Sequence, residues 1–112
     1  MEYEFKNEFS IEIFRIIQES LTNAARHSKA TIIKIDIEIS NNTFILSIKD
    51  NGIGISKEAE FNLKKFGILG IKERISKLNG KIKILTAENE GVNISIEIPN
   101  ISEYILETKD SQ

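Results

Sequence analysis

The sequence predicts an α+β fold, a two-layer sandwich in which helices pack on one face of a mixed β-sheet. Residues 9–27 and 67–79 each carry apolar side chains along one face at helical spacing. Two further regions alternate apolar and polar residues, which is typical of strands with one wet face. Each helix has one apolar stripe to bury and each strand pair has one apolar face, so stacking the helices on the sheet buries both.

The first predicted helix, residues 9–27, begins near Ser10, a residue type that commonly caps helix N-termini. Arg26 and Lys29 lie toward its end, where the helix dipole favours positive charge. A single buried face is expected from the apolar residues Phe9, Ile13, Ile16, Ile17, Leu21 and Ala24.

The predicted strands form two hairpins. The first hairpin turns at Asn41-Asn42, and the second turns at residues 88–91. Between the hairpins, the helix at residues 67–79 ends at Asn79-Gly80, a common C-terminal cap. The four alternating stretches are residues 31–40, 43–49, 81–87 and 92–98.

The composition limits the kinds of function that the chain can have. Its 112 residues suffice for one domain, expected over residues 1–100 with a partly disordered tail at 101–112. A net charge of -2, from 15 basic and 17 acidic residues, argues against a basic footprint for nucleic acid over the whole domain and leaves a local basic patch open. The lack of cysteine and the single histidine exclude disulfides, thiolate zinc sites and multi-histidine metal sites. No apolar run approaches the roughly 18 residues that a membrane span needs.

Three polar side chains lie beside the apolar face of the first helix. Glu19 and Asn23 are one turn apart and Arg26 follows, so all three lie on one side of the helix. A carboxylate and an amide oxygen suit Mg²⁺, which keeps several water and phosphate ligands, and arginine binds phosphate. The alternative is an ordinary solvated helix flank with ion pairs.

Two glycine-containing segments follow the first hairpin. In Asp50-x-Gly52-x-Gly54, the glycines let another molecule approach the backbone, and the aspartate can accept a hydrogen bond from an exocyclic amine. The alternative for this segment is a strand-ending turn. The segment Gly67-Ile68-Leu69-Gly70 opens the second helix, where free backbone N–H groups hold phosphate. The alternative here is a loop that needs flexibility before a helix.

Together and in this order, these segments resemble the ATP-binding domain of two-component sensor histidine kinases, in the GHKL superfamily of Bergerat-fold ATPases. Residues 13–30, with Gln18-Glu19, Asn23 and Arg26-His27, resemble the N box of the nitrate-sensor-like subclass, which has a short lid. Residues 50–54 resemble the G1 box, and residues 66–75 resemble the G2 box and the helix after it. The resemblance runs from about residue 10 to Pro99.

The resemblance implies a role for each of these residues. Asp50 would accept a hydrogen bond from the adenine amino group, and Asn23 would ligate the Mg²⁺ that bridges the phosphates. Glu19 occupies the position of a residue that helps to prime phosphoryl transfer. The other implied nucleotide contacts are Arg26 and His27 on the phosphate side, Gly52 and Gly54 beside the nucleotide, and Gly67, Leu69 and Gly70 in the G2 box.

Two features depart from the family's pattern. Val92 follows Gly91 where many relatives have Thr or Ser, so a hydroxyl near adenine is missing. The lid segment at residues 56–65 carries lysines but no arginine. His27 is not the expected phosphoacceptor, because the family's acceptor histidine lies on a separate dimerising helix. A helix-end histidine favoured by the dipole is the alternative to a nucleotide contact at His27.

The resemblance implies the catalytic domain of a protein histidine kinase, which uses ATP and Mg²⁺ to phosphorylate a histidine on a dimerisation domain absent from these 112 residues. A response regulator would be reached indirectly, and neither nucleic acid nor direct membrane contact is expected. The expected location is the cytoplasm, as a soluble protein or as the cytoplasmic part of a membrane-anchored kinase. Two alternatives stay open, a stand-alone nucleotide-binding regulatory module and an anti-sigma-type serine kinase.

Overall fold

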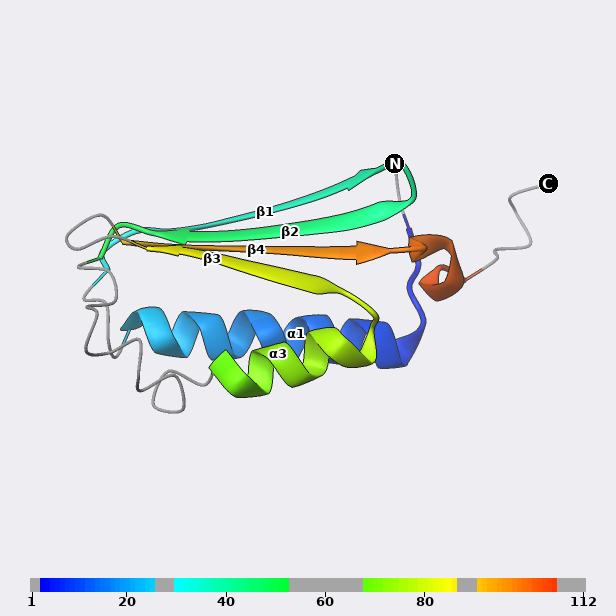
Figure 1. The fold of residues 1–112 in the computed structure, drawn as a ribbon, viewed down its shortest axis with the longest axis horizontal. Helices are drawn as coiled ribbons and strands as arrows, with labels where there is room; N and C mark the ends of the chain where they lie inside the picture. Colours follow the sequence, from blue (N-terminus) through cyan, green and yellow to red (C-terminus); the bar gives the residue numbers. More distant parts are fainter. Residues whose placement is uncertain (1–2, 26–29, 53–67, 87–90, 107–112) are drawn as a thin grey trace.

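The computed structural model describes residues 3–25, 30–52, 68–86 and 91–106. The helices form one layer and the strands form the other (Figure 1). The predicted α+β two-layer sandwich is therefore confirmed. Within the described ranges the elements follow the order α1 (Asn7–Asn23), β1 (Ile33–Ser40), β2 (Thr43–Asp50), α3 (Ile68–Lys77), β3 (Lys81–Thr86), β4 (Val92–Pro99) and the 3₁₀ helix η2 (Ile101–Tyr104).

The described strands form one 4-stranded sheet in the order β1-β2-β4-β3. Every pairing is antiparallel, with Ile37 opposite Leu46 in the first pair and Leu46 opposite Ile96 in the central pair. The expectation of a mixed sheet is wrong for these strands. Each hairpin is antiparallel by construction, and the hairpins join through β2 and β4, which run in opposite directions, so the four described strands include no parallel pair.

A two-residue turn sets the register of the first hairpin. Asn41 and Asn42 have φ angles of 51° and 59°, the left-handed conformation that a type I′ turn needs at both central positions. Ser40 and Thr43 face each other directly on either side of the turn. In this register the isoleucines of β1 share one sheet face with Phe44, Leu46 and Ile48 of β2.

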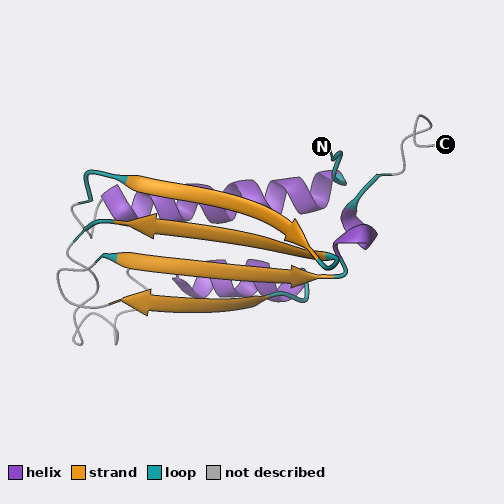
Figure 2. Cartoon of the chain, turned by 90° about the horizontal axis from the view of Figure 1, so that it is seen from above, coloured by secondary structure: helices purple, strands orange, loops and turns teal. Residues whose placement is uncertain are grey.

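The core lies between this sheet face and the helices, which cover the same side of the sheet (Figure 2). Ile16 of α1, Ile71 of α3 and Ile96 of β4 are each 0% exposed. Burying a side chain of this size contributes about 1.5–3 kcal/mol to folding. Packing among these residues holds the helices against the sheet.

The start of α1 differs from the sequence prediction. The N-cap is Lys6, which makes no side-chain capping hydrogen bond, and the Ser10 N–H already donates to the Lys6 carbonyl at 3.1 Å. Ser10 as the N-cap is therefore wrong. Aromatic packing explains the earlier start, because Phe9 is 1% exposed and its ring centroid lies 5.1 Å from that of Phe44.

No helix in the described ranges is long and apolar enough to cross a membrane.

The end of α3 agrees with the predicted cap. Asn79 has a φ of 57°, and the Gly80 N–H donates to the Ile75 carbonyl at 2.9 Å. A left-handed residue followed by such a backward hydrogen bond terminates a helix. The chain then turns directly into β3.

The segment after β4 packs on the core. Ile101 is 1% exposed, and the Tyr104 ring stacks on Phe9 with centroids 5.0 Å apart. The Tyr104 hydroxyl donates to the Leu78 carbonyl at 3.3 Å. Residues 101–106 of the predicted tail therefore lie against the domain, and residues 107–112 fall outside the described part of the chain.

Candidate functional site

The Asp50 carboxylate is held by backbone donors at the end of β2. Its Oδ1 accepts hydrogen bonds from the Gly52 N–H at 2.9 Å and from the Val92 N–H at 3.2 Å. Gly52 is buried and Asp50 is half-buried. These donors come from two separate segments of the chain, so the carboxylate has a fixed orientation where β2 ends and β4 begins.

Gly91 makes this arrangement possible. Its φ of +78° lies in the left-handed region, and a Cβ at this position would overlap the Asp50 carbonyl oxygen. The same Cβ would lie 3.2 Å from Asp50 Oδ1. A side chain at residue 91 would therefore push the start of β4 away from Asp50.

Asn51 is a structural residue that the sequence interpretation did not single out. Its side-chain Oδ1 accepts from the N–H groups of Thr31 and Ile32, both at 2.9 Å, and its Nδ2 donates to the Thr31 hydroxyl at 2.9 Å. The amide thus joins the residue after β2 to the segment that enters β1. The sequence signal for this role is an asparagine directly after a strand. Its hydrogen-bond partners lie about 20 residues upstream, so the local pattern does not identify them.

Glu19 lies on α1 and pairs with α3. Its Oε1 accepts from Arg74 Nε at 3.3 Å, and Arg74 Nη1 lies 3.4 Å from Glu12 Oε2. Glu19 Oε2 is buried and has no hydrogen-bond partner among the described residues. Gly70 faces this oxygen, since a Cβ on Gly70 would lie 3.4 Å from it. Among the described residues, this carboxylate oxygen therefore lacks a donor, and it lies beside a glycine.

Asn23 is the last residue of α1 and is half-buried. It follows Glu19 by one helical turn, so both side chains lie on one side of the helix. The described residues contain no group of three or more histidine, aspartate or glutamate side chains that could hold a metal ion. A cation here would therefore need the Asn23 amide oxygen together with water and phosphate ligands.

The described candidate residues gather at one end of the molecule. The end of α1, the end of β2 and the start of β4 lie together at the left of Figure 1, opposite the start of α1 and η2. Leu69 and Gly70 lie in the first turn of α3, and Leu69 is 41% exposed. The other candidates, Arg26, His27, Gly54 and Gly67, fall outside the described residues.

Comparison with known proteins identifies the family. The family of histidine kinase-, DNA gyrase B- and HSP90-like ATPases matches residues 9–102. The chain belongs to this family. It is 38% identical over 99 residues to the signal transduction histidine-protein kinase/phosphatase DegS of Brevibacillus brevis, covering 88% of this chain and 25% of that protein. It is 42% identical over 94 residues to DegS of Bacillus subtilis (strain 168), covering 82% and 24%. The chain spans about a quarter of these relatives' length.

Solved histidine kinase structures share the fold. A histidine kinase domain from the Erythrobacter litoralis blue-light activated kinase EL346 aligns with a TM-score of 0.74 at 19% identity, over 86% of this chain and 46% of that chain. The Acinetobacter baumannii histidine kinase AdeS aligns with a TM-score of 0.66 at 28% identity, over 79% and 45%. The family predicted from the three sequence segments is confirmed.

Proposed function

We propose that this chain binds Mg-ATP where α1, β2 and β4 meet, and that it donates the γ-phosphate to a histidine on a dimerisation domain outside the chain. A response regulator would then receive the phosphoryl group, in the cytoplasm. One observation carries the proposal, namely that two backbone N–H groups fix the Asp50 carboxylate. Membership of the ATPase family supports it independently.

Asp50 is suited to bind adenine. Both backbone donors use Oδ1, so within the described part of the chain Oδ2 is left to accept from an exocyclic amino group. Val92 takes part through its backbone N–H. Val92 stands where many relatives carry a hydroxyl, but the hydrogen bond to Asp50 comes from the backbone, so the change of side chain leaves this hydrogen bond intact.

The phosphate side would be formed by α1 and the start of α3. Asn23 would supply the amide oxygen for Mg²⁺, which when bound neutralises charge on the phosphates. The orphaned Glu19 Oε2 fits a magnesium-bound water beside Gly70. Glu19 would also help to prime the transfer. We assign further nucleotide contacts to Arg26, His27, Gly52, Gly54, Gly67 and Leu69.

Asp50→Asn tests the adenine assignment. An amide keeps the Oδ1 acceptor for Gly52 and Val92 but replaces Oδ2 with a donor, which opposes the adenine amino group. Losing a hydrogen bond to a charged group costs about 1.5–3 kcal/mol, so calorimetry should show ATP affinity falling roughly ten- to a hundred-fold. Affinity for inosine triphosphate, whose 6-oxo group accepts a hydrogen bond, should rise relative to ATP.

Glu97→Gln is the matched control, because it changes a carboxylate to an amide at an exposed position of β4. It should leave both nucleotide affinities unchanged. If Asp50→Asn binds ATP as the parent does, the adenine site is assigned wrongly.

A phosphotransfer assay separates the proposed kinase from its alternatives. The chain is mixed with labelled ATP and the dimerisation domain of its own kinase. Acid-labile phosphate on a histidine is the expected result. Acid-stable phosphate on a serine would indicate an anti-sigma-type kinase, and nucleotide binding without transfer would indicate a regulatory module.

A further inference from the structure

The first and last turns of α3 both face one carboxylate of α1. Gly70 and Arg74 are four residues apart, so they lie on one face of α3. Arg74 Nε lies 3.3 Å from Glu19 Oε1, and a Cβ on Gly70 would lie 3.4 Å from Glu19 Oε2. The two oxygens of Glu19 are therefore divided between these positions. Oε1 has a donor, whereas Oε2 lies beside the glycine with no donor among the described residues.

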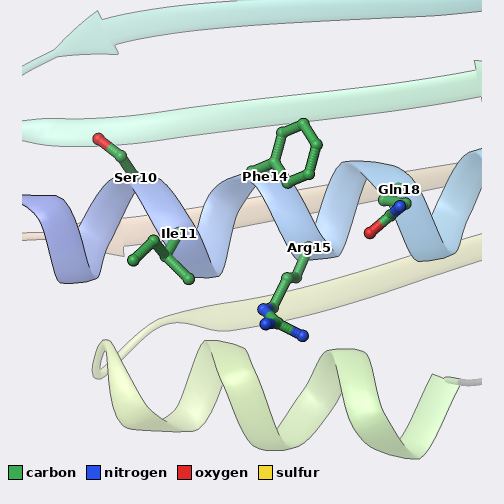
Figure 3. A pocket seen from close by; sticks show the side chains of 5 residues that line it. All are labelled: Ser10, Ile11, Phe14, Arg15 and Gln18. Atoms are coloured by element: carbon green, nitrogen blue, oxygen red, sulfur yellow. The ribbon is translucent and has the colours of Figure 1, made fainter.

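Arg74 is the described cation that pairs with Glu19. Arg15 precedes Glu19 by one helical turn, a spacing at which ion pairs form on a helix. However, Arg15 makes no ion pair with any described residue, and it lines an open hollow on α1 beside Phe14 and Gln18 (Figure 3). The orientation of the Glu19 carboxylate therefore depends on a residue of α3 rather than on its own helix.

A second carboxylate orients the guanidinium of Arg74. Nη1 of Arg74 lies 3.4 Å from Oε2 of Glu12, two turns before Glu19 on α1. Because the guanidinium is planar and rigid, holding Nη1 also sets the direction in which Nε donates. One guanidinium facing two carboxylates leaves one negative charge uncompensated among these three side chains. The unpaired Oε2 of Glu19 is therefore suited to face a cation or a donor bound to one.

We propose that Arg74 is a positioning residue for phosphoryl transfer, which holds Glu19 Oε1 so that Oε2 stays turned toward the phosphates. The proposal rests on the function proposed above. In that step a ring nitrogen of the acceptor histidine bonds to the γ-phosphorus, and ADP leaves with the electron pair of the broken bond to the bridging oxygen. The proton on the other ring nitrogen passes to solvent. Arg74 acts only by restricting rotation of the Glu19 carboxylate, and such a transfer depends mainly on positioning.

Loss of this hydrogen bond should slow transfer more than it weakens nucleotide binding. In the phosphotransfer assay with the dimerisation domain, Arg74→Met should lower kcat roughly ten- to a hundred-fold, the range that a hydrogen bond to a charged group supplies. The KM for Mg-ATP should rise by less, because Asp50 and Asn23 are unchanged. Arg74→Gln is measured alongside, since it keeps a polar side chain at this partly exposed position.

A double-mutant cycle separates positioning from a merely structural role. When Glu19 is already replaced by Gln, Arg74→Met should slow transfer by no more than about twofold, because the carboxylate that it positions is gone. A residue that only joined the helices would cost the same factor in both backgrounds. Glu12→Gln is the matched control, because it removes the other carboxylate that pairs with Arg74, and it should leave kcat unchanged.

The contact can also be measured without nucleotide, through the NMR signal of the Arg74 Nε–H. The chain contains three arginines, and the signal of Arg74 is the one that Arg74→Met removes. Its Nε–H should exchange with water more slowly than that of Arg15, because it donates to Glu19. Glu19→Gln should shift this signal more than Glu12→Gln does. An Arg74 Nε–H that exchanges as fast as that of Arg15, or that Glu19→Gln does not shift, would overturn the proposal.

The kinetic outcomes separate this inference from the proposed function. A parent chain that transfers no phosphate would overturn the proposed function, and Glu19→Gln without effect on kcat would overturn the role of Glu19 together with that of Arg74. If Glu19→Gln slows transfer and Arg74→Met does not, the positioning role alone is wrong. It is also wrong if Arg74→Met costs the same factor in both backgrounds, or if Glu12→Gln slows transfer equally. Circular dichroism of each variant establishes that the fold is kept.

Discussion

Asp50 is the residue on which the nucleotide site depends. Its carboxylate joins the end of β2 to the start of β4, through a hydrogen bond between residues 42 positions apart. That contact needs Gly91, whose left-handed φ brings the chain against the Asp50 backbone. The site is therefore coupled to the stability of the second hairpin.

We expect Gly91→Ala to lower the free energy of unfolding by about 1–3 kcal/mol, the usual cost of a strained backbone conformation. The added Cβ would also overlap the Asp50 carbonyl, so ATP binding should weaken. Urea denaturation measures the first effect and calorimetry the second. An unchanged unfolding midpoint would contradict the geometry described for Gly91.

Gly70→Ala should have the opposite effect on stability. The new Cβ would lie 3.4 Å from Glu19 Oε2, an ordinary contact, and alanine favours a helix over glycine by about 0.5–1 kcal/mol. Stability should therefore hold or rise. Mg-ATP affinity should fall, because the methyl group covers the carboxylate oxygen that we propose faces a magnesium-bound water. Unchanged Mg-ATP affinity would rule out that role for Glu19.

The positions of Asp50 and Glu19 could be predicted because each interrupts a regular pattern within one element. The role of Arg74 could not, since its partner Glu19 is 55 positions away and the pair exists only once α1 and α3 pack. Asn51 was missed for the same reason. A local pattern predicts which side chains are available for contact, whereas the fold decides which of them meet.

At the scale of elements, Arg74 is the described charged link between the helices. It contacts Glu12 and Glu19, two turns apart on α1, from the last turn of α3. Arg74 is 23% exposed, so water screens these pairs only in part. The link holds the last turn of α3 against α1.

We expect Arg74→Met to lower the free energy of unfolding by about 1 kcal/mol, since partly exposed ion pairs contribute at that scale. Glu12→Gln should cost less, because Glu19 remains paired. A double-mutant cycle over positions 12 and 74 measures the coupling directly. A coupling energy of zero would show that the Arg74–Glu12 pair contributes nothing to holding the helices together.

The elements themselves were largely predictable. Period-2 alternation around Asn41-Asn42 gave the first hairpin, and one apolar stripe gave α1. The helix start was not predictable from capping preference, because burial of Phe9 among other aromatic rings outweighed the preference of Ser10 for the cap. Tertiary packing commonly overrides such local preferences.

At the scale of the molecule, the two ends of the sheet carry different residues. The described candidate residues lie at one end of the sheet, and the start of α1 and η2 lie at the other (Figure 1). The two-layer class followed from the need to bury one face of each element. The antiparallel pairing of the four described strands did not, because a strand's own pattern does not indicate which strands of the two hairpins will be neighbours.

Our central claim is that the end formed by α1, β2 and β4 binds ATP. The most direct measurement is a titration of Mg-ATP into the isotope-labelled chain, followed through its backbone amide NMR signals. We predict saturable shifts concentrated at Asn23, Asp50, Gly52 and Val92. The signals of Ile11, near the start of α1, and of Ile37, in the middle of β1, should not shift. The absence of shifts, or shifts concentrated at Ile11 and Ile37, would contradict the claim.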